Sequence, residues 1–242
     1  MPSSRTFKRF ARRRVRIPKP WKYRSIRKRK SIWASIRVGE KSRSNSKGEV
    51  PQGLDHDTQA KKKLVPFGLL VLNMAWLTVI FGKQETSDFW VDCLKEWWLS
   101  ARVAFRHIKR LVIYLDNGPH TFGYRTQFLK RIIAFSDWSG LEIHLVYYPP
   151  YHSKYNLIER CWGALEKKWN GTLLNCLQVV LYWARRMTWC GKHPDVKYLD
   201  KDYQKKVTVP PNEMKQYEAR LQRSKTLPKY DIRIVPQRLK SG

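Results

Sequence analysis

A short apolar run that ends in an acid constrains the fold of this chain most strongly. Residues 111–115 read Leu-Val-Ile-Tyr-Leu and are followed by Asp116 and then by an Asn-Gly-Pro turn. A run of this length, rich in branched side chains and bounded by turn residues, predicts a buried β-strand over 111–116. The strand would present Asp116 at its carboxyl end, where open α/β sheets bind their ligands. The alternative is that Asp116 only caps the turn, since Asp-Asn-Gly-Pro is favourable turn chemistry.

Hydrophobic patterns on both sides of this strand predict alternating strands and helices. A hairpin is expected over about 65–81 with its turn near Asn73, and a helix is expected to open at Thr86-Ser87-Asp88, with Thr86 or Ser87 as N-cap. The remaining predicted elements are a short strand over 32–38, a helix over 122–137, a strand over 141–147, a helix from Asn156 to Asn170 ended by Gly171, a helix over 173–190, a helical stretch near 212–223 and a strand near 231–235. This order predicts an α/β fold in which the strand before Asp116 lies centrally.

Residues 64–81 are almost wholly apolar and nearly long enough to cross a bilayer. Pro66, Gly68 and Asn73 interrupt the run, which favours two buried strands, and no membrane association is expected. The four cysteines, at 93, 161, 176 and 190, lack the CxxC spacing of structural zinc sites. They are expected to be buried thiols in a reducing cytosol.

Positive charge is concentrated at the start of the chain. The net charge is +30, and residues 1–50 hold 18 Lys and Arg against two Glu, whereas the 242 residues together are 42% hydrophobic and can bury one sizeable core. Residues 1–30 are therefore predicted to be a disordered basic arm that binds DNA through residues such as Arg12, Arg13 and Arg14. The alternative is a solvated tail without function.

A second acid, Glu159, stands at the predicted opening of a helix. Together, Asp116 and Glu159 could supply hard oxygen ligands to a pair of Mg²⁺ or Mn²⁺ ions, as phosphodiester chemistry requires. The alternative for Glu159 is a capping box, because Asn156 stands at N-cap and Glu159 at N3.

Basic and histidine side chains surround the second acid in the sequence. Lys154, Arg160, Lys167 and Lys168 could hold phosphates, or they could form an ordinary solvated helix face. His120 and His152 are weaker candidates near the site, and His144 is expected to be a hydrogen-bonded polar residue.

The segment from Tyr147 to Gly163 resembles the third-carboxylate motif of the ISAzo-type insertion-sequence DDE transposases, and Leu115–Pro119 resembles their second motif. Shorter likenesses occur at 54–57, 66–68 and 85–89, and the resemblance covers about residues 31–235. It implies an RNase H-like mixed sheet flanked by helices, Mg²⁺ dependence, and DNA cleavage and strand transfer by multimers acting on element ends. A bacterial cytoplasmic, nucleoid-associated location follows from the same resemblance.

The chain departs from the family at the first catalytic aspartate. Family members carry it on the opening strand, but the corresponding segment here, Ser31–Glu40, has no acid before Glu40. Asp55 or Asp57 could substitute only by proximity. Our interpretation is a truncated or decayed member with an arm over 1–30, a catalytic core over 31–190 and an extension over 191–242.

Three functions remain open at this point. The chain could be a Mg²⁺-dependent transposase, a catalytically inactive remnant that only binds DNA, or a generic basic protein associated with RNA. Paired acids argue against the last, because carboxylates repel a phosphate backbone unless a metal ion intervenes.

Overall fold

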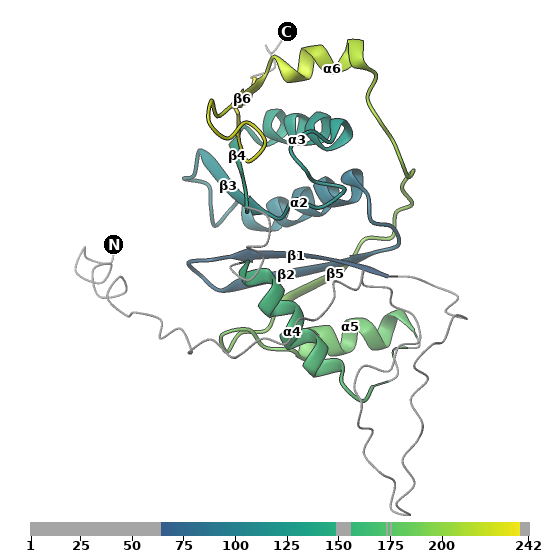
Figure 1. Ribbon diagram of the computed structural model, residues 1–242. Coiled ribbons are helices and arrows are strands. Elements are labelled where there is room, and N and C mark those ends of the chain that lie inside the picture. The colour runs from purple at the N-terminus through teal and green to yellow at the C-terminus, as the bar shows by residue number, and fades with distance from the viewer. Residues whose placement is uncertain (1–63, 149–155, 173, 175, 238–242) are drawn as a thin grey trace, which may run out of the picture. The chain divides into compact units, whose positions relative to one another are not determined.

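The computed structural model describes residues 64–148, 156–172, 174 and 176–237 (Figure 1). The chain divides into two units, 1–30 and 31–242, and every described residue belongs to the second. The predicted basic arm and the predicted strand over 32–38 lie outside the described residues. The described elements are β1 (Val65–Val71), β2 (Trp76–Gly82), α2 (Ser87–Ala101), β3 (Arg110–Leu115), α3 (Thr126–Ser139), β4 (Glu142–Tyr147), α4 (Leu157–Trp169), α5 (Leu177–Arg186), β5 (Asp195–Tyr198), α6 (Pro211–Glu218), β6 (Leu221–Arg223) and β7 (Asp231–Ile234).

The first sheet is built on the predicted hairpin, which is confirmed. β1 and β2 pair antiparallel from Val65 opposite Gly82 to Val71 opposite Trp76. The backbone N–H of Met74 donates to the carbonyl of Val71 at 3.2 Å, which closes the turn between them. β5 adds in parallel to the other side of β2, so that the order is β1-β2-β5. The apolar run 64–81 thus forms the two strands of this hairpin. In the described part of the chain, no helix is long and apolar enough to span a membrane.

The second sheet carries the strand that precedes Asp116. β3 pairs in parallel with β4, and β7 and β6 follow antiparallel, in the order β3-β4-β7-β6. The predicted α/β class, with mixed sheets flanked by helices, is confirmed. The described strands nevertheless form two sheets instead of one, and among them β3 lies at an edge, not at the centre as predicted.

Helices cover both sheets. α2 contributes Val91, Leu94, Trp97 and Trp98 to a buried cluster that also contains side chains of α3, β3, β4, β6 and β7, and Leu69 and Val71 of β1 pack against the same cluster. α4 and α5 cover the opposite face of β2 in a second cluster. In Figure 1 the sheet β1-β2-β5 accordingly lies between α2 on one side and α4 and α5 on the other. A layer of helix, sheet and helix of this kind buries both faces of the sheet.

Several boundaries differ from the predictions for physical reasons. α3 begins at Thr126, because residues 116–125 form turns in which Gly123 lies against a carbonyl: a Cβ on it would stand 2.5 Å from the oxygen of Lys229. Thr86 is the N-cap of α2, accepting from the N–H of Phe89 at 3.1 Å. The helical prediction over 212–223 is wrong at its end, since α6 stops at Glu218 and residues 221–223 form β6.

The region after residue 190 supplies strands to both sheets. β5 joins β2, and β7 pairs with β4. The guanidinium of Arg220 holds this region to the end of α3 through two hydrogen bonds, at 2.7 and 2.6 Å, to the carboxylate of Asp137. The division of the chain at residue 190 remains a prediction.

The cysteines divide into two kinds. Cys93 and Cys161 are buried, as expected, and burial raises the pKa of the Cys161 thiol to about 12. Cys176 and Cys190 are exposed, so the expectation of a buried thiol is wrong for these two. Cys176 is the N-cap residue of α5, and Cys190 lies in the tight turn between Trp189 and Lys192 that precedes β5.

Candidate functional site

Asp116 lies directly after β3, at its carboxyl end, and its side chain is exposed. The backbone around it is fixed on both sides. The N–H of Tyr148 donates to the carbonyl of Leu115 at 2.8 Å, and the carbonyl of Gly118 accepts from the N–H groups of Thr121 at 3.2 Å and Phe122 at 3.0 Å. The turn is therefore closed by backbone groups.

The carboxylate of Asp116 makes no ion pair or hydrogen bond within the described part of the chain, which disfavours a role limited to turn capping. Most other described acids are engaged. Among those with a side-chain partner are Asp88, Asp92, Asp137, Glu142, Asp195, Asp200, Asp202, Glu213, Glu218 and Asp231. Although Lys and Arg side chains are in excess in this protein, the carboxylate of Asp116 pairs with none of them in the described part of the chain. It is therefore available to a bound metal ion.

A buried tyrosine anchors the loop that follows Asp116. The hydroxyl of Tyr147, at the end of β4, donates to the carbonyl of Thr121 at 2.6 Å. Burial raises the pKa of this hydroxyl, and Arg223 opposes the shift only in part. Tyr147 therefore stays a neutral donor at physiological pH, and it ties the loop to the neighbouring strand.

Glu159 lies in the first turn of α4 and is exposed. Asn156 is the N-cap of this helix, as predicted: its side-chain oxygen accepts from the N–H of Ile158 at 3.4 Å. The N–H of Glu159 donates to the carbonyl of Asn156 at 3.1 Å, which begins the helix. The positive end of the helix dipole at this point favours an acid here on electrostatic grounds alone.

The position of α4 depends on a glycine in β1. A Cβ added to Gly68 would stand 2.5 Å from the ring of Trp162 and 2.9 Å from Ile158, so only glycine permits this approach. The sequence pattern placed Gly68 as an interruption in an apolar run and within a short segment that resembles the family, and it did not predict this contact. A glycine inside a strand pattern is itself a signal of close approach, and it could have identified the contact.

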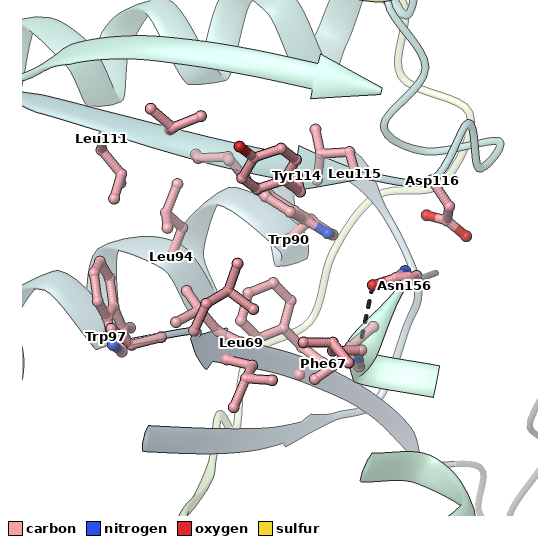
Figure 2. A pocket seen from close by; sticks show the side chains of 18 of the residues that line it. Phe67, Leu69, Trp90, Leu94, Trp97, Leu111, Tyr114, Leu115, Asp116 and Asn156 are labelled. Carbon is pink, nitrogen blue, oxygen red and sulfur yellow. Dashed lines mark hydrogen bonds between the residues drawn. The ribbon is translucent and has the colours of Figure 1, made fainter. Parts of the chain in front are cut away.

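The end of β3 and the beginning of α4 meet at one cavity. Asp116, Tyr148 and Asn156 line it together with Leu157 and Ile158. Figure 2 shows Asp116 and Asn156 at the same end of this cavity, beyond the apolar side chains that fill most of its wall. The structure thus brings the two predicted carboxylate-bearing segments to a common place, although Glu159 itself is not among the lining residues.

Some of the other predicted site residues lie in the described part of the chain, and the rest lie outside it. Arg160 is exposed in the first turn of α4, and the ammonium group of Lys168, in its last turn, lies 5.9 Å from the ring of Trp183. His144 pairs with Asp231 at 3.0 Å, which confirms the expected hydrogen-bonded role. The predicted residues outside the described part are Arg12, Arg13, Arg14, Asp55, Asp57, His152 and Lys154.

His120 occupies the turn after Asp116. Its backbone carbonyl accepts from the hydroxyl of Ser87 at 2.7 Å, which joins this turn to the N-terminus of α2. This contact involves only the backbone of His120, and the place of its imidazole in the candidate site stays a prediction.

Comparison with known proteins adds the family. A family model described as the Rhodopirellula transposase DDE domain matches residues 26–236. The chain belongs to this DDE transposase family. The match spans both sheets, and so it includes Asp116 and Glu159. No curated protein and no solved structure matches the chain.

DDE transposase domains generally use divalent metal ions. The residues of this chain fit such an ion in kind, because Asp116 and Glu159 offer carboxylate oxygens, the ligands that Mg²⁺ and Mn²⁺ prefer. Within the described ranges no group of three or more His, Cys, Asp or Glu is arranged to hold a metal ion.

Proposed function

We propose that this DDE transposase family member binds Mg²⁺ or Mn²⁺ through Asp116 and Glu159 and uses the ions to cleave and join DNA during transposition. The observation that carries the proposal is the exposed, unengaged carboxylate of Asp116 at the end of β3, on the cavity that also receives the N-terminus of α4. The metal ions would activate the attacking hydroxyl and stabilise the leaving oxygen.

The protein's own contributions are positional. The backbone bond from Tyr148 to Leu115 and the Tyr147 anchor hold the Asp116 loop. The contact of α4 with Gly68 and the Asn156 cap hold Glu159 in the first turn of its helix. Rigid support of this kind keeps two ligands from different segments within the narrow range that an octahedral ion demands.

DNA is the proposed substrate. Arg160 lies one residue after Glu159, and Lys167 and Lys168 follow on the same helix, so phosphates held along α4 would run towards the carboxylates. The arm residues Arg12, Arg13 and Arg14 are proposed to add sequence-independent affinity that falls steeply with salt. A homo-oligomer acting on paired element ends at the bacterial nucleoid completes the proposal.

Metal binding is the direct test. Mn²⁺ titration of the purified chain, followed by electron paramagnetic resonance of the free ion, should show weaker binding in Asp116→Asn and in Glu159→Gln. Glu166→Gln is the matched control, because it removes an exposed acid from the same helix two turns further on. Unchanged Mn²⁺ affinity in both site variants would refute the proposed ligands.

Activity is tested on linear DNA carrying the element ends. We expect Mg²⁺-dependent nicking and strand transfer by the wild-type chain and by Glu166→Gln, and loss of at least 100-fold in Asp116→Asn, because removing a metal ligand removes the charge stabilisation it supports. Retained transfer by Asp116→Asn would exclude a catalytic role for that residue.

A second candidate is a catalytically inactive relative that binds DNA only. The absence of an acid in Ser31–Val38 favours it, because the first carboxylate of the family is expected there. This candidate predicts salt-dependent DNA binding with equal affinity in wild type and Asp116→Asn, and no nicking by either.

A further inference from the structure

The turn between β6 and β7 carries positive charge and no acid. Residues 224–230 read Ser-Lys-Thr-Leu-Pro-Lys-Tyr. Lys225 and Lys229 are exposed, and neither makes an ion pair with another described residue. Two ammonium groups on one short turn, with no carboxylate to neutralise them, attract an anionic partner.

Hydrogen bonds hold this turn in one conformation. The N–H of Ser224 donates to the carbonyl of Asp231 at 3.0 Å and closes the turn at its base. The guanidinium of Arg223 donates to the carbonyl of Pro228 and to the carboxylate of Glu218, both at 3.0 Å. The two lysines therefore project from a fixed backbone, which reduces the ordering that a partner must impose when it binds.

The sheet places the turn at the same edge as Asp116. β4 runs parallel to β3, β7 runs antiparallel to β4, and β6 runs antiparallel to β7, so the ends of β3, β4 and β6 and the start of β7 meet there. Two to three strand spacings, or about 10–14 Å, separate β7 and β6 from β3. This distance equals about three to four steps of 3.4 Å along a DNA strand.

Direct contacts join the turn to the loop that begins with Asp116. The guanidinium of Arg223 donates to the carbonyl of Gly123 at 2.9 Å. The ring of Tyr124 is 45% exposed, with the Arg223 guanidinium 4.4 Å and the Lys229 ammonium group 6.0 Å from its centroid. An exposed aromatic ring among cations is typical of surfaces that contact nucleic acid.

We propose that Lys225, Lys229 and Tyr124 form a DNA-binding surface on the β4 side of Asp116, with the two lysines on phosphates and the tyrosine ring against a sugar or base. The α4 track lies on the other side, because α4 packs against β1, across the cavity from β3. DNA bound at Asp116 would thus be held on both sides of the carboxylate. This inference rests on the proposed function in taking DNA as the substrate.

The salt dependence of DNA binding tests the role of the lysines. Anisotropy of a fluorescein-labelled duplex of mixed sequence, measured in EDTA so that no cleavage occurs, gives the affinity between about 50 and 200 mM salt. The double variant Lys225→Gln/Lys229→Gln should lower the slope of log K against log salt by about two, one for each lost phosphate contact. The change leaves the backbone contact of Lys229 with Gly123 in place.

Arg106→Gln/Lys109→Gln is the matched control. Both residues are exposed and without an ion pair to any described residue, and they precede β3, at the opposite edge of the same sheet. The control removes the same charge and should leave the slope within about 0.5 of the wild-type value.

Photo-cross-linking locates the DNA without removing any charge. Leu227 is 54% exposed at the tip of the turn, and Val103 is 77% exposed in the segment before β3. With the same duplex, Leu227→p-benzoylphenylalanine should cross-link to DNA at least about tenfold more than Val103→p-benzoylphenylalanine, because only the turn lies against phosphates. This measurement also decides the matter if the lysine variant does not fold.

Three results overturn the proposal: an unchanged slope in Lys225→Gln/Lys229→Gln, an equal fall in both double variants, or equal cross-linking at the two positions. A cross-link from position 227 to a second copy of the chain in place of DNA assigns the turn to a protein interface and also overturns it. All of these leave the proposed function standing as long as the wild-type chain binds DNA. A wild-type chain that binds no DNA in EDTA overturns both this surface and DNA as the substrate.

Discussion

The two candidate ligands are held by different kinds of interaction. Asp116 belongs to the sheet β3-β4-β7-β6, where backbone hydrogen bonds and the Tyr147 hydroxyl fix its loop. Glu159 belongs to α4, which packs against β1 through the close contact of Trp162 with Gly68. Directional bonds tolerate small changes in side-chain volume, but close packing does not. We therefore expect the Glu159 side of the site to be the more sensitive to changes in shape.

The largest effect is expected from Gly68→Val. The added side chain would occupy the space of the Trp162 ring, so α4 must shift, and overpacking of this kind costs about 1–3 kcal/mol. Urea unfolding should show the loss of stability, and Mn²⁺ titration should show weaker binding through Glu159. Gly163→Ala is the control, since its Cβ would meet nothing within 4 Å and should stabilise the helix by up to about 1 kcal/mol. Equal behaviour of the two variants would contradict the proposed role of Gly68.

A smaller effect is expected from Tyr147→Phe on the Asp116 side. The change removes one buried hydrogen bond and leaves the Thr121 carbonyl without this donor, at a cost of about 1–2 kcal/mol. Hydrogen exchange should increase in residues 116–125 and stay unchanged in α4. If exchange rises equally in α4, the two halves of the site are not supported separately.

Removal of the α4 cap should have a similar or smaller effect. Asn156→Ala deletes the side-chain oxygen that accepts from Ile158, and N-cap loss costs about 0.5–2 kcal/mol. The 3.4 Å length of this bond places the expected value near the lower end. Thr86→Ala, which removes the cap of α2, is the matched variant: it should lower the free energy of unfolding by about as much without changing Mn²⁺ affinity. Asn156→Ala, by contrast, should also weaken Mn²⁺ binding, because α4 carries Glu159. An equal loss of Mn²⁺ affinity in Thr86→Ala would show that the weaker binding does not come from α4.

The smallest effect is expected from acid pH, and it is an effect on the stability of the fold. Burial acts to raise the pKa of Asp137, but hydrogen bonds from Arg220 and from the N–H of Gln237 outweigh it, and the pKa is lowered. A lowered folded-state pKa means that the stabilisation is complete above the unfolded value, near pH 4, and is lost as pH falls through the folded value. Urea midpoints measured between pH 5 and pH 2 should fall less steeply in Asp137→Asn than in wild type. Identical slopes in the two proteins would show that the Asp137–Arg220 pair does not contribute to the pH dependence of stability.

Local patterns predicted the elements that bear the candidate ligands. The alternation of apolar residues and the turn at Asn73 predicted the hairpin, and the Asn-Gly-Pro sequence predicted where β3 ends. The Asn156 cap fixed the start of α4. The two strands that were not predicted, β5 and β6, have four and three residues and mixed polarity, so their pairing partners decide their conformation. The late start of α3 depends on the contact of Gly123 with Lys229, which lies more than 100 residues further along the chain.

The sequence by itself determined the α/β class, the family, and the placing of Asp116 at a strand end and Glu159 in the first turn of a helix, because strand ends and helix starts are set by neighbouring residues. Only the tertiary structure decided that the described strands form two sheets, that α2 packs against both, and that β1 and β3 face each other across an apolar cavity. These features depend on which distant segments share a core, and that is a matter of packing between elements, which periodicity within one element does not encode.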